Sequence, residues 1–134
     1  PFLVWHPVKY AELLAERMRR HGSSAWLINT GWTGGGPGAG SRMSIKHTRA
    51  IINAIHDGDL RYTDTATDPF FGLDVPTSCP HVPREVLIPR QAWADTASYD
   101  RTASRVASLF VENFAQFEAG ADPEVKAAGP TVTG

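Results

Sequence analysis

The residues best placed to do chemistry lie around a cluster of glycines. Six of the twelve glycines fall within residues 31–40, after the mostly apolar residues 25–29 and before the helical pattern of residues 44–56. A strand, a glycine loop and a helix in this order often bind phosphate or nucleotide, because glycine lets backbone N–H groups approach an anion and the helix dipole favours negative charge. The pattern fits an anion or nucleotide site and a flexible surface turn equally well.

Neither standard template for such a loop fits this one. Residues 35–41 have the glycine spacing of a Walker loop, but Ser41-Arg42 stands where that template needs Lys followed by Ser or Thr. Residues 34–39 satisfy the relaxed dinucleotide pattern, which a glycine-rich stretch meets easily by chance. No second strand ending in an acidic residue follows at the spacing that a dinucleotide fold requires. The pattern alone therefore leaves the class of the loop open.

Three side chains that follow the loop have structural as well as binding interpretations. Arg42 stands near the start of the helical pattern, and its guanidinium can stack on a purine or bond to its edge. The alternative is a solvated arginine, but the helix dipole disfavours a cation at this end, which gives the binding role modest support. Thr48 shares the apolar face of that helix, where its hydroxyl can simply bond the carbonyl four residues back. Met43 suits packing against a flat ring and filling a core equally well.

Histidine and cysteine spacing argues against a metal site or a catalytic residue within the chain. None of the five histidines pairs with another at a helical interval of three or four residues, and Cys79-Pro80-His81 supplies only two possible ligands. No local motif points to a serine, histidine and acid arrangement for nucleophilic catalysis. His47 lies away from the isoleucine stripe of its helix, which favours a solvated side chain.

Composition and charge exclude several classes of protein and partner. Of the 134 residues, 42% are hydrophobic and 20% are charged, which is typical of one globular domain. The formal net charge of −1 argues against nucleic acid and anionic membranes as partners, and no apolar run approaches the roughly 20 residues of a membrane span. The lone cysteine, Cys79, favours a reducing compartment, so we expect a cytoplasmic protein. Because the chain begins with Pro1, we expect it to be part of a longer protein.

The helices and strands that would position these residues are predicted from the spacing of hydrophobic residues and from the positions of glycine and proline. The hydrophobic spacing and the stop signals predict three helices, two short strands and a loose tail: helices over residues 8–21, 44–56 and 95–118, strands over 25–29 and 70–75, and a tail over 120–134. Five prolines within residues 59–93 favour an extended segment there. We expect residues 1–134 to form a single partial domain.

Motifs along nearly the whole chain match those of one enzyme family. They are HP at residues 6–7 with YAELL at 10–14, NTGWTGG at 29–35, GSRMSIK at 40–46, TRAI at 48–51, VP at 75–76 with PR at 89–90 and Trp93, LFVENF at 109–114, and AGP at 128–130. With these motifs the chain resembles the C-terminal region of the ATP-dependent phosphoenolpyruvate carboxykinases.

The resemblance implies a fold and a reaction. The fold is α/β, and this chain would be part of the C-terminal nucleotide-binding lobe of the phosphoenolpyruvate carboxykinase fold, with helices around short strands. The parent enzyme would be a carboxy-lyase of gluconeogenesis that converts oxaloacetate and ATP to phosphoenolpyruvate, ADP and CO2 with a divalent metal, manganese or magnesium.

The resemblance also assigns roles to residues. In the family this region contributes to the site for the base and ribose of ATP, and the matching positions here are Arg42, Met43 and Thr48. The family's phosphate loop, metal ligands and oxaloacetate-binding arginines lie upstream, so we expect no catalytic residue, no metal site and no activity in this chain alone. One departure is Ser41, where the family usually has lysine. The alternative is a non-enzymatic module, either a glycine-loop nucleotide-binding domain or a structural one.

Overall fold

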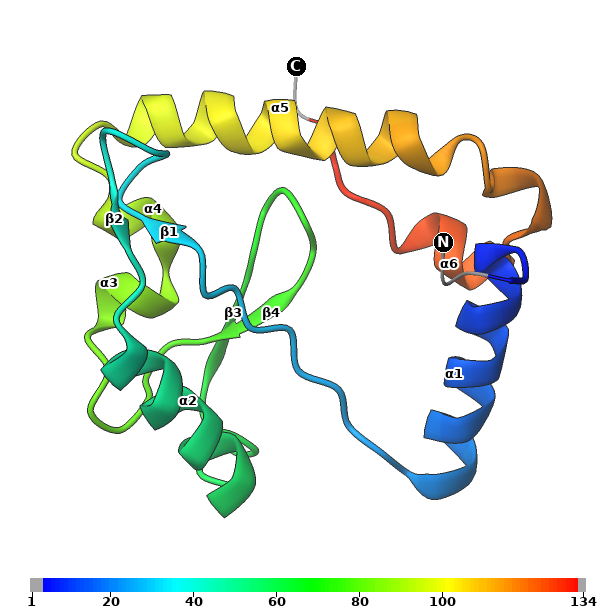
Figure 1. Cartoon of the computed structure of the whole chain (residues 1–134), viewed down its shortest axis with the longest axis horizontal. Helices are drawn as coiled ribbons and strands as arrows, with labels where there is room; N and C mark the ends of the chain where they lie inside the picture. The colour runs from blue at the N-terminus through cyan, green and yellow to red at the C-terminus, as the bar shows by residue number, and fades with distance from the viewer. Residues whose placement is uncertain (1–3, 133–134) are drawn as a thin grey trace.

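Helices joined by long connections surround two small β-hairpins. The computed structural model describes residues 4–132. The elements, in chain order, are α1 (Pro7–His21), β1 (Trp32–Thr33), β2 (Ser41–Arg42), α2 (Ile45–Asp57), β3 (Thr65–Thr67), β4 (Asp74–Pro76), α3 (Arg84–Leu87), α4 (Pro89–Ala92), α5 (Thr96–Phe114), the 3-10 turn η1 (Glu118–Gly120) and α6 (Pro123–Ala127) (Figure 1). The combination of helices and short antiparallel strands confirms the predicted α/β class.

Capping residues explain why the first two helices lie where the sequence predicts them. Pro7 occupies the first turn of α1, and Gly22 ends this helix in the left-handed conformation with φ of 60°. The Ser44 hydroxyl accepts a hydrogen bond of 3.2 Å from the Lys46 amide at the start of α2. Gly58 ends that helix at φ of 84°. Both helices are confirmed.

Helix α5 begins as predicted but ends at Phe114, earlier than the predicted residue 118. The Asp95 carboxylate caps its start by accepting a 2.9 Å hydrogen bond from the Ala97 amide. At the other end the chain turns toward α1, and the Phe117 ring meets the His6 ring edge-on at 5.6 Å. A contact between the two ends of the chain, which helical periodicity does not encode, thus accompanies the end of this helix.

Two antiparallel hairpins make up the sheet content of the described residues, and neither predicted strand forms as expected. Strand β1 pairs with β2, and β3 pairs with β4. In the predicted strand over 70–75 only the last residues join β4. The Asp68 carboxylate accepts hydrogen bonds from the Phe70 and Phe71 amides, at 2.9 Å and 2.8 Å, and so holds a turn where a strand was expected.

The predicted strand over 25–29 is absent, and this expectation was wrong for the chain as it stands. The segment runs without regular structure from the end of α1 to β1, across the middle of the view in Figure 1. A strand exists only through hydrogen bonds to a neighbour, and no other strand among residues 4–132 pairs with this segment. The local pattern is that of a strand, but the partner is missing.

The buried core is small. Among residues 4–132, six apolar residues are buried, and three of them, Ala54, Leu60 and Cys79, form one cluster between α2 and the turns that follow it. Burial raises the pKa of the Cys79 thiol, and the nearby Asp59 carboxylate raises it further, so the thiol stays protonated at neutral pH. Many large apolar side chains remain exposed, which is unusual for a complete globular domain.

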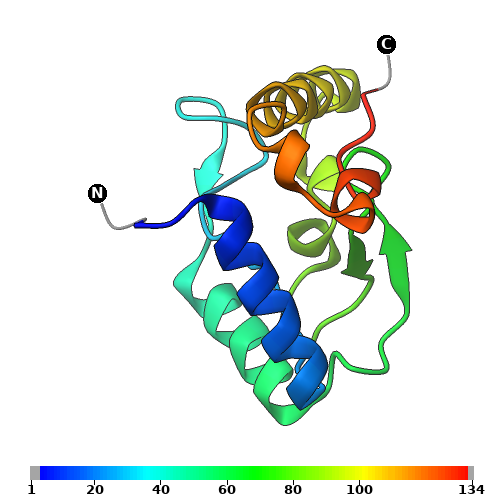
Figure 2. The same ribbon diagram turned by 90° about the vertical axis from the view of Figure 1, so that its right-hand side faces the viewer.

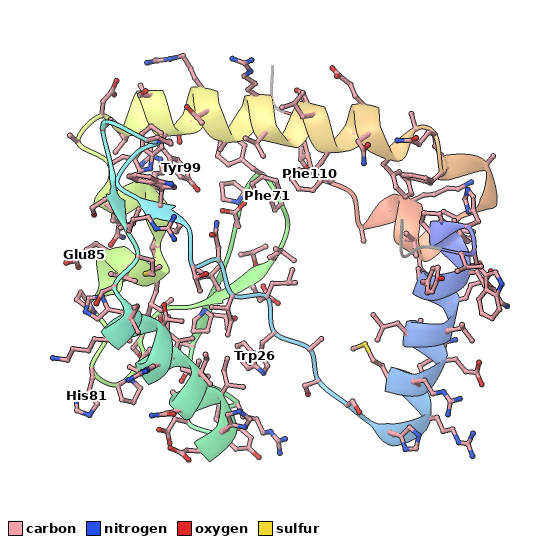
Figure 3. The ribbon with its side chains drawn as sticks, viewed as in Figure 1. Trp26, Phe71, His81, Glu85, Tyr99 and Phe110 are labelled. Atoms are coloured by element: carbon pink, nitrogen blue, oxygen red, sulfur yellow. The ribbon has the colours of Figure 1, made fainter. Side chains whose placement is uncertain are left out.

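Aromatic contacts join α5 to the proline-rich region. The Tyr99 ring lies 5.7 Å from that of Trp93 and 6.3 Å from that of Phe70, and Phe71 meets Phe110 at 6.0 Å (Figure 3). Burial, more than the nearby carboxylates, raises the pKa of the Tyr99 phenol. These edge-on pairs attach the β3–β4 hairpin loop and α4 to one face of α5.

Residues 120–132 contain more regular structure than the loose tail that the sequence predicts. They include α6, and the Thr131 amide donates a 2.8 Å hydrogen bond to the Phe70 carbonyl oxygen. Figure 2 shows α6 beside the start of α1 and below the end of α5. Residues 133 and 134 of that tail lie outside the described residues. No helix in the described range has the length and apolar character needed to span a membrane.

Candidate nucleotide site

The glycine cluster forms the loop of a β-hairpin. Strands β1 and β2 pair in antiparallel register, and the Met43 amide extends the pairing with a 2.9 Å hydrogen bond to the Gly31 carbonyl oxygen. Inside the loop, the Gly40 amide donates a 2.9 Å bond to the Gly36 carbonyl oxygen. The predicted order of strand, loop and helix is therefore corrected, because a second strand separates the loop from α2.

Some of these glycines are required by the backbone itself. A Cβ atom on Gly40 would collide with the Gly35 carbonyl oxygen and lie 2.5 Å from that of Thr33. Gly34 has φ of 73°, and its Cβ would lie 3.1 Å from the Ala92 carbonyl oxygen. Gly36, in contrast, faces open space. Part of the glycine cluster thus has a structural reason that is independent of any ligand.

Arg42 lies across the hairpin from an aromatic residue. In the β1–β2 register Trp32 is its direct partner, and the guanidinium carbon sits 6.0 Å from the centre of the indole ring. This distance is within the range of a cation–π contact. Both side chains are exposed. Trp32 was not predicted as a site residue, because only the hairpin register places it opposite Arg42.

Met43 and Thr48 flank the start of α2. Met43 is half-buried in the short connection between β2 and this helix. The Thr48 hydroxyl donates a 3.2 Å hydrogen bond to the Ser44 carbonyl oxygen. This is the bond to the carbonyl four residues back that is expected if the threonine has only a structural role. That bond uses the hydroxyl proton and leaves an acceptor lone pair on the oxygen. No interaction joins the side chains of Arg42, Met43 and Thr48 within residues 4–132.

The apolar face of α2 differs in part from the predicted one. Ile51 and Ile55 pack against the core cluster, as expected. Ile45 and Ile52 are exposed, at 71% and 38% of their surface. Thr48, which is half-buried, therefore lies between the packed side of the helix and a side that the described residues leave exposed.

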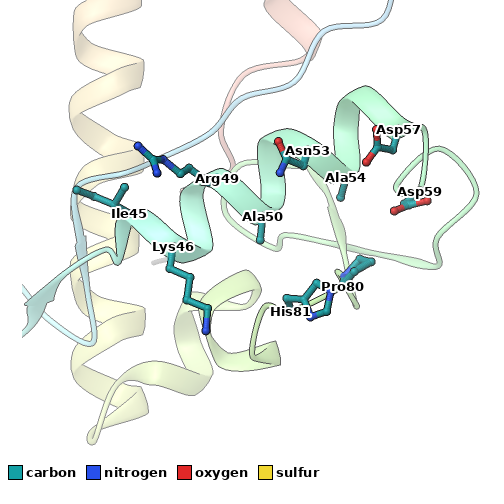
Figure 4. A pocket seen from close by; sticks show the side chains of 10 residues that line it. All are labelled: Ile45, Lys46, Arg49, Ala50, Asn53, Ala54, Asp57, Asp59, Pro80 and His81. Carbon is teal, nitrogen blue, oxygen red and sulfur yellow. The ribbon is translucent and has the colours of Figure 1, made fainter.

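A cavity of about 610 Å³ lies along another side of α2 (Figure 4). It is open to the surface and is lined by charged, polar and apolar side chains from this helix and the following turns: Ile45, Lys46, Arg49, Ala50, Asn53, Ala54, Asp57, Asp59, Pro80 and His81. His81 adopts a left-handed backbone with φ of 62°. None of Arg42, Met43 and Thr48 lines this cavity, so the predicted site is an open surface beside the hairpin.

The described residues do not fit a metal ion. Between residues 4 and 132 no group of three or more histidine, cysteine, aspartate or glutamate side chains is placed to ligate one. A 2.8 Å ion pair between Arg90 and Asp100 joins α4 to α5. Both residues lie far from the β1–β2 hairpin in the sequence. The chemistry available around the hairpin is stacking, cation–π contact and hydrogen bonding.

Comparison with known proteins defines the class. A family model described as phosphoenolpyruvate carboxykinase matches residues 1–85. A phosphoenolpyruvate carboxykinase (ATP) of Dictyostelium discoideum is 54% identical over 130 residues, which is 97% of this chain and 23% of the relative. Enzymes of the same name from Salinibacter ruber and Moorella thermoacetica are 52% and 51% identical over 96% and 98% of the chain, and 24% and 25% of their own lengths.

The chain belongs to the phosphoenolpyruvate carboxykinase (ATP) family. The resemblance drawn from the motifs is therefore confirmed. The chain spans about a quarter of the length of the curated relatives it matches.

Proposed function

We propose that this chain is the part of an ATP-dependent phosphoenolpyruvate carboxykinase that holds the base and ribose of ATP. The longer protein would convert oxaloacetate and ATP to phosphoenolpyruvate, ADP and CO2, as a carboxy-lyase of gluconeogenesis. The observation that carries the proposal is the pairing of Arg42 with Trp32 at the end of the glycine hairpin, immediately before α2. Membership of a family whose relatives are named for ATP supports it.

The hairpin residues have complementary roles in this proposal. The Arg42 guanidinium carbon lies over the Trp32 indole, and in the proposed complex the exposed guanidinium also stacks on the adenine ring. Trp32 acts as a positioning residue for that arginine. The free lone pair of the Thr48 hydroxyl accepts a hydrogen bond from the exocyclic amino group of adenine. Met43 offers a polarisable apolar surface to the ring.

The chemical steps take place outside this chain. Loss of CO2 from oxaloacetate leaves an enolate, whose oxygen forms a bond to the γ-phosphorus of ATP while the bond from that phosphorus to the ADP oxygen breaks. Such transfer depends on positioning and charge neutralisation rather than on a protein nucleophile. Since the described residues do not fit a metal ion, we assign the divalent metal, manganese or magnesium, to residues elsewhere in the longer protein. This chain fixes one end of ATP.

We place the protein in the cytoplasm, with oxaloacetate and ATP as its partners. The free thiol of Cys79 fits a reducing compartment. The net charge of −1 provides no excess of cations for nucleic acid. That residues 1–134 form a single partial domain of the longer protein remains a prediction.

A purely structural hairpin is the second candidate function. Two features favour this candidate. The hairpin backbone leaves no room for a Cβ atom at Gly40, and the Thr48 hydroxyl already has a hydrogen-bond partner within α2. Neither feature requires a ligand. In this case the hairpin would serve packing alone, and no change in it would alter nucleotide affinity unless the fold changed too.

A hybrid protein tests the proposed function. In it, residues 1–134 replace the matching quarter of the Dictyostelium discoideum relative, with which they share 54% identity. We expect the hybrid to form phosphoenolpyruvate from oxaloacetate and ATP, and the 134-residue chain alone to form none. A hybrid that is folded by its melting curve but binds no ATP in calorimetry would contradict the proposal.

Substituting Thr48 distinguishes a nucleotide-binding role of its hydroxyl from a purely structural one. In the hybrid protein, Thr48→Val is expected to weaken ATP binding by about 0.5–1.5 kcal/mol, because an acceptor for the adenine amino group is lost. Melting temperature should change little, since the helix loses only a bond from a side chain to its own backbone. Thr102→Val is the matched control, because that hydroxyl makes the same kind of bond, at 2.8 Å, within α5. Equal ATP affinity of both variants in calorimetry would leave Thr48 a structural role only.

A further inference from the structure

The cavity beside α2 is lined by charged side chains that have no partner in the described part of the chain. Lys46, Arg49, Asp57 and Asp59 form no ion pair and no side-chain hydrogen bond within residues 4–132. Lys46 lies in the first turn of α2, and Asp57 is the last residue of this helix. A helix dipole disfavours a cation at the first end and an anion at the second, so the stability of α2 does not explain these two charges.

A strained turn brings a histidine to the same cavity. The Val82 amide donates a 3.2 Å hydrogen bond to the Cys79 carbonyl oxygen and so closes a four-residue turn with Pro80 and His81 at its centre. His81 is the one non-glycine residue with a positive φ, at 62°, among residues 4–132. Glycine adopts this conformation without a steric cost, whereas a larger residue there is uncommon and points to a use for its side chain. Buried Cys79 anchors the turn, and His81 forms part of the cavity wall.

The cavity has a cationic end and an acidic end. Figure 4 shows Lys46 extending on the same side of α2 as His81, whereas Asp59 lies by the opposite end of the helix. The side chains of Ala50 and Ala54 form an apolar wall between the two ends. From Lys46 to its last residue, α2 rises about 16 Å. A ligand that reaches both ends is therefore elongated and carries charges of opposite sign.

We propose that this cavity binds an elongated zwitterion, with its carboxylate at Lys46 and His81 and its ammonium group at Asp59. The Lys46 ammonium and an imidazole N–H of His81 donate hydrogen bonds to the carboxylate, and the Asp59 carboxylate accepts one from the ammonium group. The cavity volume, about 610 Å³, is typical of small-molecule sites. The proposal is independent of nucleotide binding at the hairpin, because none of the predicted nucleotide-site residues lines this cavity.

Three molecules that share a six-carbon chain and differ in their charged ends test the proposal: 6-aminohexanoate, hexanoate and hexylamine. Binding to the hybrid protein is followed by NMR through the methyl signals of Ala50 and Ala54, with and without ATP. We expect 6-aminohexanoate to shift both signals and to bind roughly 3- to 5-fold more tightly than either singly charged molecule, which is what one exposed ion pair contributes. ATP should not change these affinities. Equal affinities of the three molecules, or methyl signals that do not move, would overturn the proposal.

Substitutions at the two ends of the cavity determine the orientation of the ligand. Lys46→Gln should weaken binding of hexanoate and 6-aminohexanoate but not of hexylamine. Asp59→Asn should weaken binding of hexylamine and 6-aminohexanoate but not of hexanoate. Lys126→Gln is the matched control, because Lys126 is exposed on α6 and does not line the cavity, so all three affinities should stay the same. The reverse pattern, or equal effects of Lys46→Gln and Lys126→Gln, would contradict the proposed site.

Replacing His81 by glycine separates binding from folding. Glycine adopts φ of 62° more readily than histidine, so His81→Gly should melt at the same temperature as the hybrid protein or higher. The affinity for 6-aminohexanoate should fall roughly 2- to 10-fold, because the carboxylate loses a hydrogen-bond donor. A His81→Gly protein that binds this molecule as tightly as the parent hybrid, or that melts at a lower temperature, would show that the histidine serves packing, and the proposal would be wrong.

Discussion

Replacing Arg42 by alanine in the hybrid protein is expected to weaken ATP binding by about 1.5–3 kcal/mol, because a charged donor and a stacking plane are lost together. The Trp32 indole, 6.0 Å from the guanidinium carbon, would remain in the hairpin without its partner. Calorimetry with ATP measures the effect, and a melting curve of each variant confirms that the protein is still folded.

Two further variants sharpen the Arg42 result. Arg42→Lys keeps the charge but loses the planar group, so it should recover only part of the lost affinity. Arg105→Ala removes an exposed arginine from α5, away from the hairpin in the chain, and should leave ATP affinity unchanged. An Arg42→Ala protein that binds ATP as tightly as the parent hybrid would contradict the assigned site, although family membership would stand.

Substitution of Gly40 is expected to disrupt the hairpin. In Gly40→Ala the new methyl group would collide with the Gly35 carbonyl oxygen and crowd that of Thr33, which are backbone atoms of the same loop. Forced overpacking of this kind costs about 1–3 kcal/mol, so the loop should rearrange and the Arg42–Trp32 pairing should weaken. Faster hydrogen exchange at the Met43 amide, which closes the hairpin on Gly31, reports this opening.

Gly36→Ala is the matched control for Gly40→Ala. Nothing lies within 4 Å of the position that its Cβ would occupy, so the hairpin should keep its shape and the Met43 amide its exchange rate. ATP affinity in the hybrid protein should fall for Gly40→Ala and not for Gly36→Ala. The opposite order, or equal exchange rates in the two variants, would show that the hairpin geometry does not depend on the absence of a side chain at position 40.

Helix boundaries could be predicted because their signals are local. Ser44 caps the start of α2, while Gly22 and Gly58 end α1 and α2 in left-handed conformations. Each of these residues acts on backbone groups within one helical turn of itself. The end of α5 was not predicted, because the aromatic contact between Phe117 and His6 joins residues at opposite ends of the chain.

Strand formation could not be predicted from local pattern alone. The run around Leu27 has the composition of a buried strand, but its partner is not within the described residues. The β1–β2 hairpin was missed for the opposite reason. Its strands are two residues long, too short to show alternation, and pairing across the glycine loop sets the register.

The candidate site was predicted from resemblance more than from physical pattern. Glycine clustering located the loop, and the motif supplied Arg42, Met43 and Thr48. The pairing of Trp32 with Arg42 is visible only in the hairpin register. The cavity beside α2 was not predicted either, because it depends on how the turn at His81 packs near residues from a different part of the chain.

Photolabelling of the hybrid protein with 8-azido-ATP tests the central claim most directly, since the azide is carried on the adenine ring itself. After irradiation and digestion, we expect the label on peptides that contain residues 32–48, with labelling suppressed by excess ATP. The Arg42→Ala variant should lose most of this label. Label confined to the portion of the hybrid that comes from the Dictyostelium discoideum relative, with none on residues 32–48, would contradict the claim that this chain holds the base of ATP.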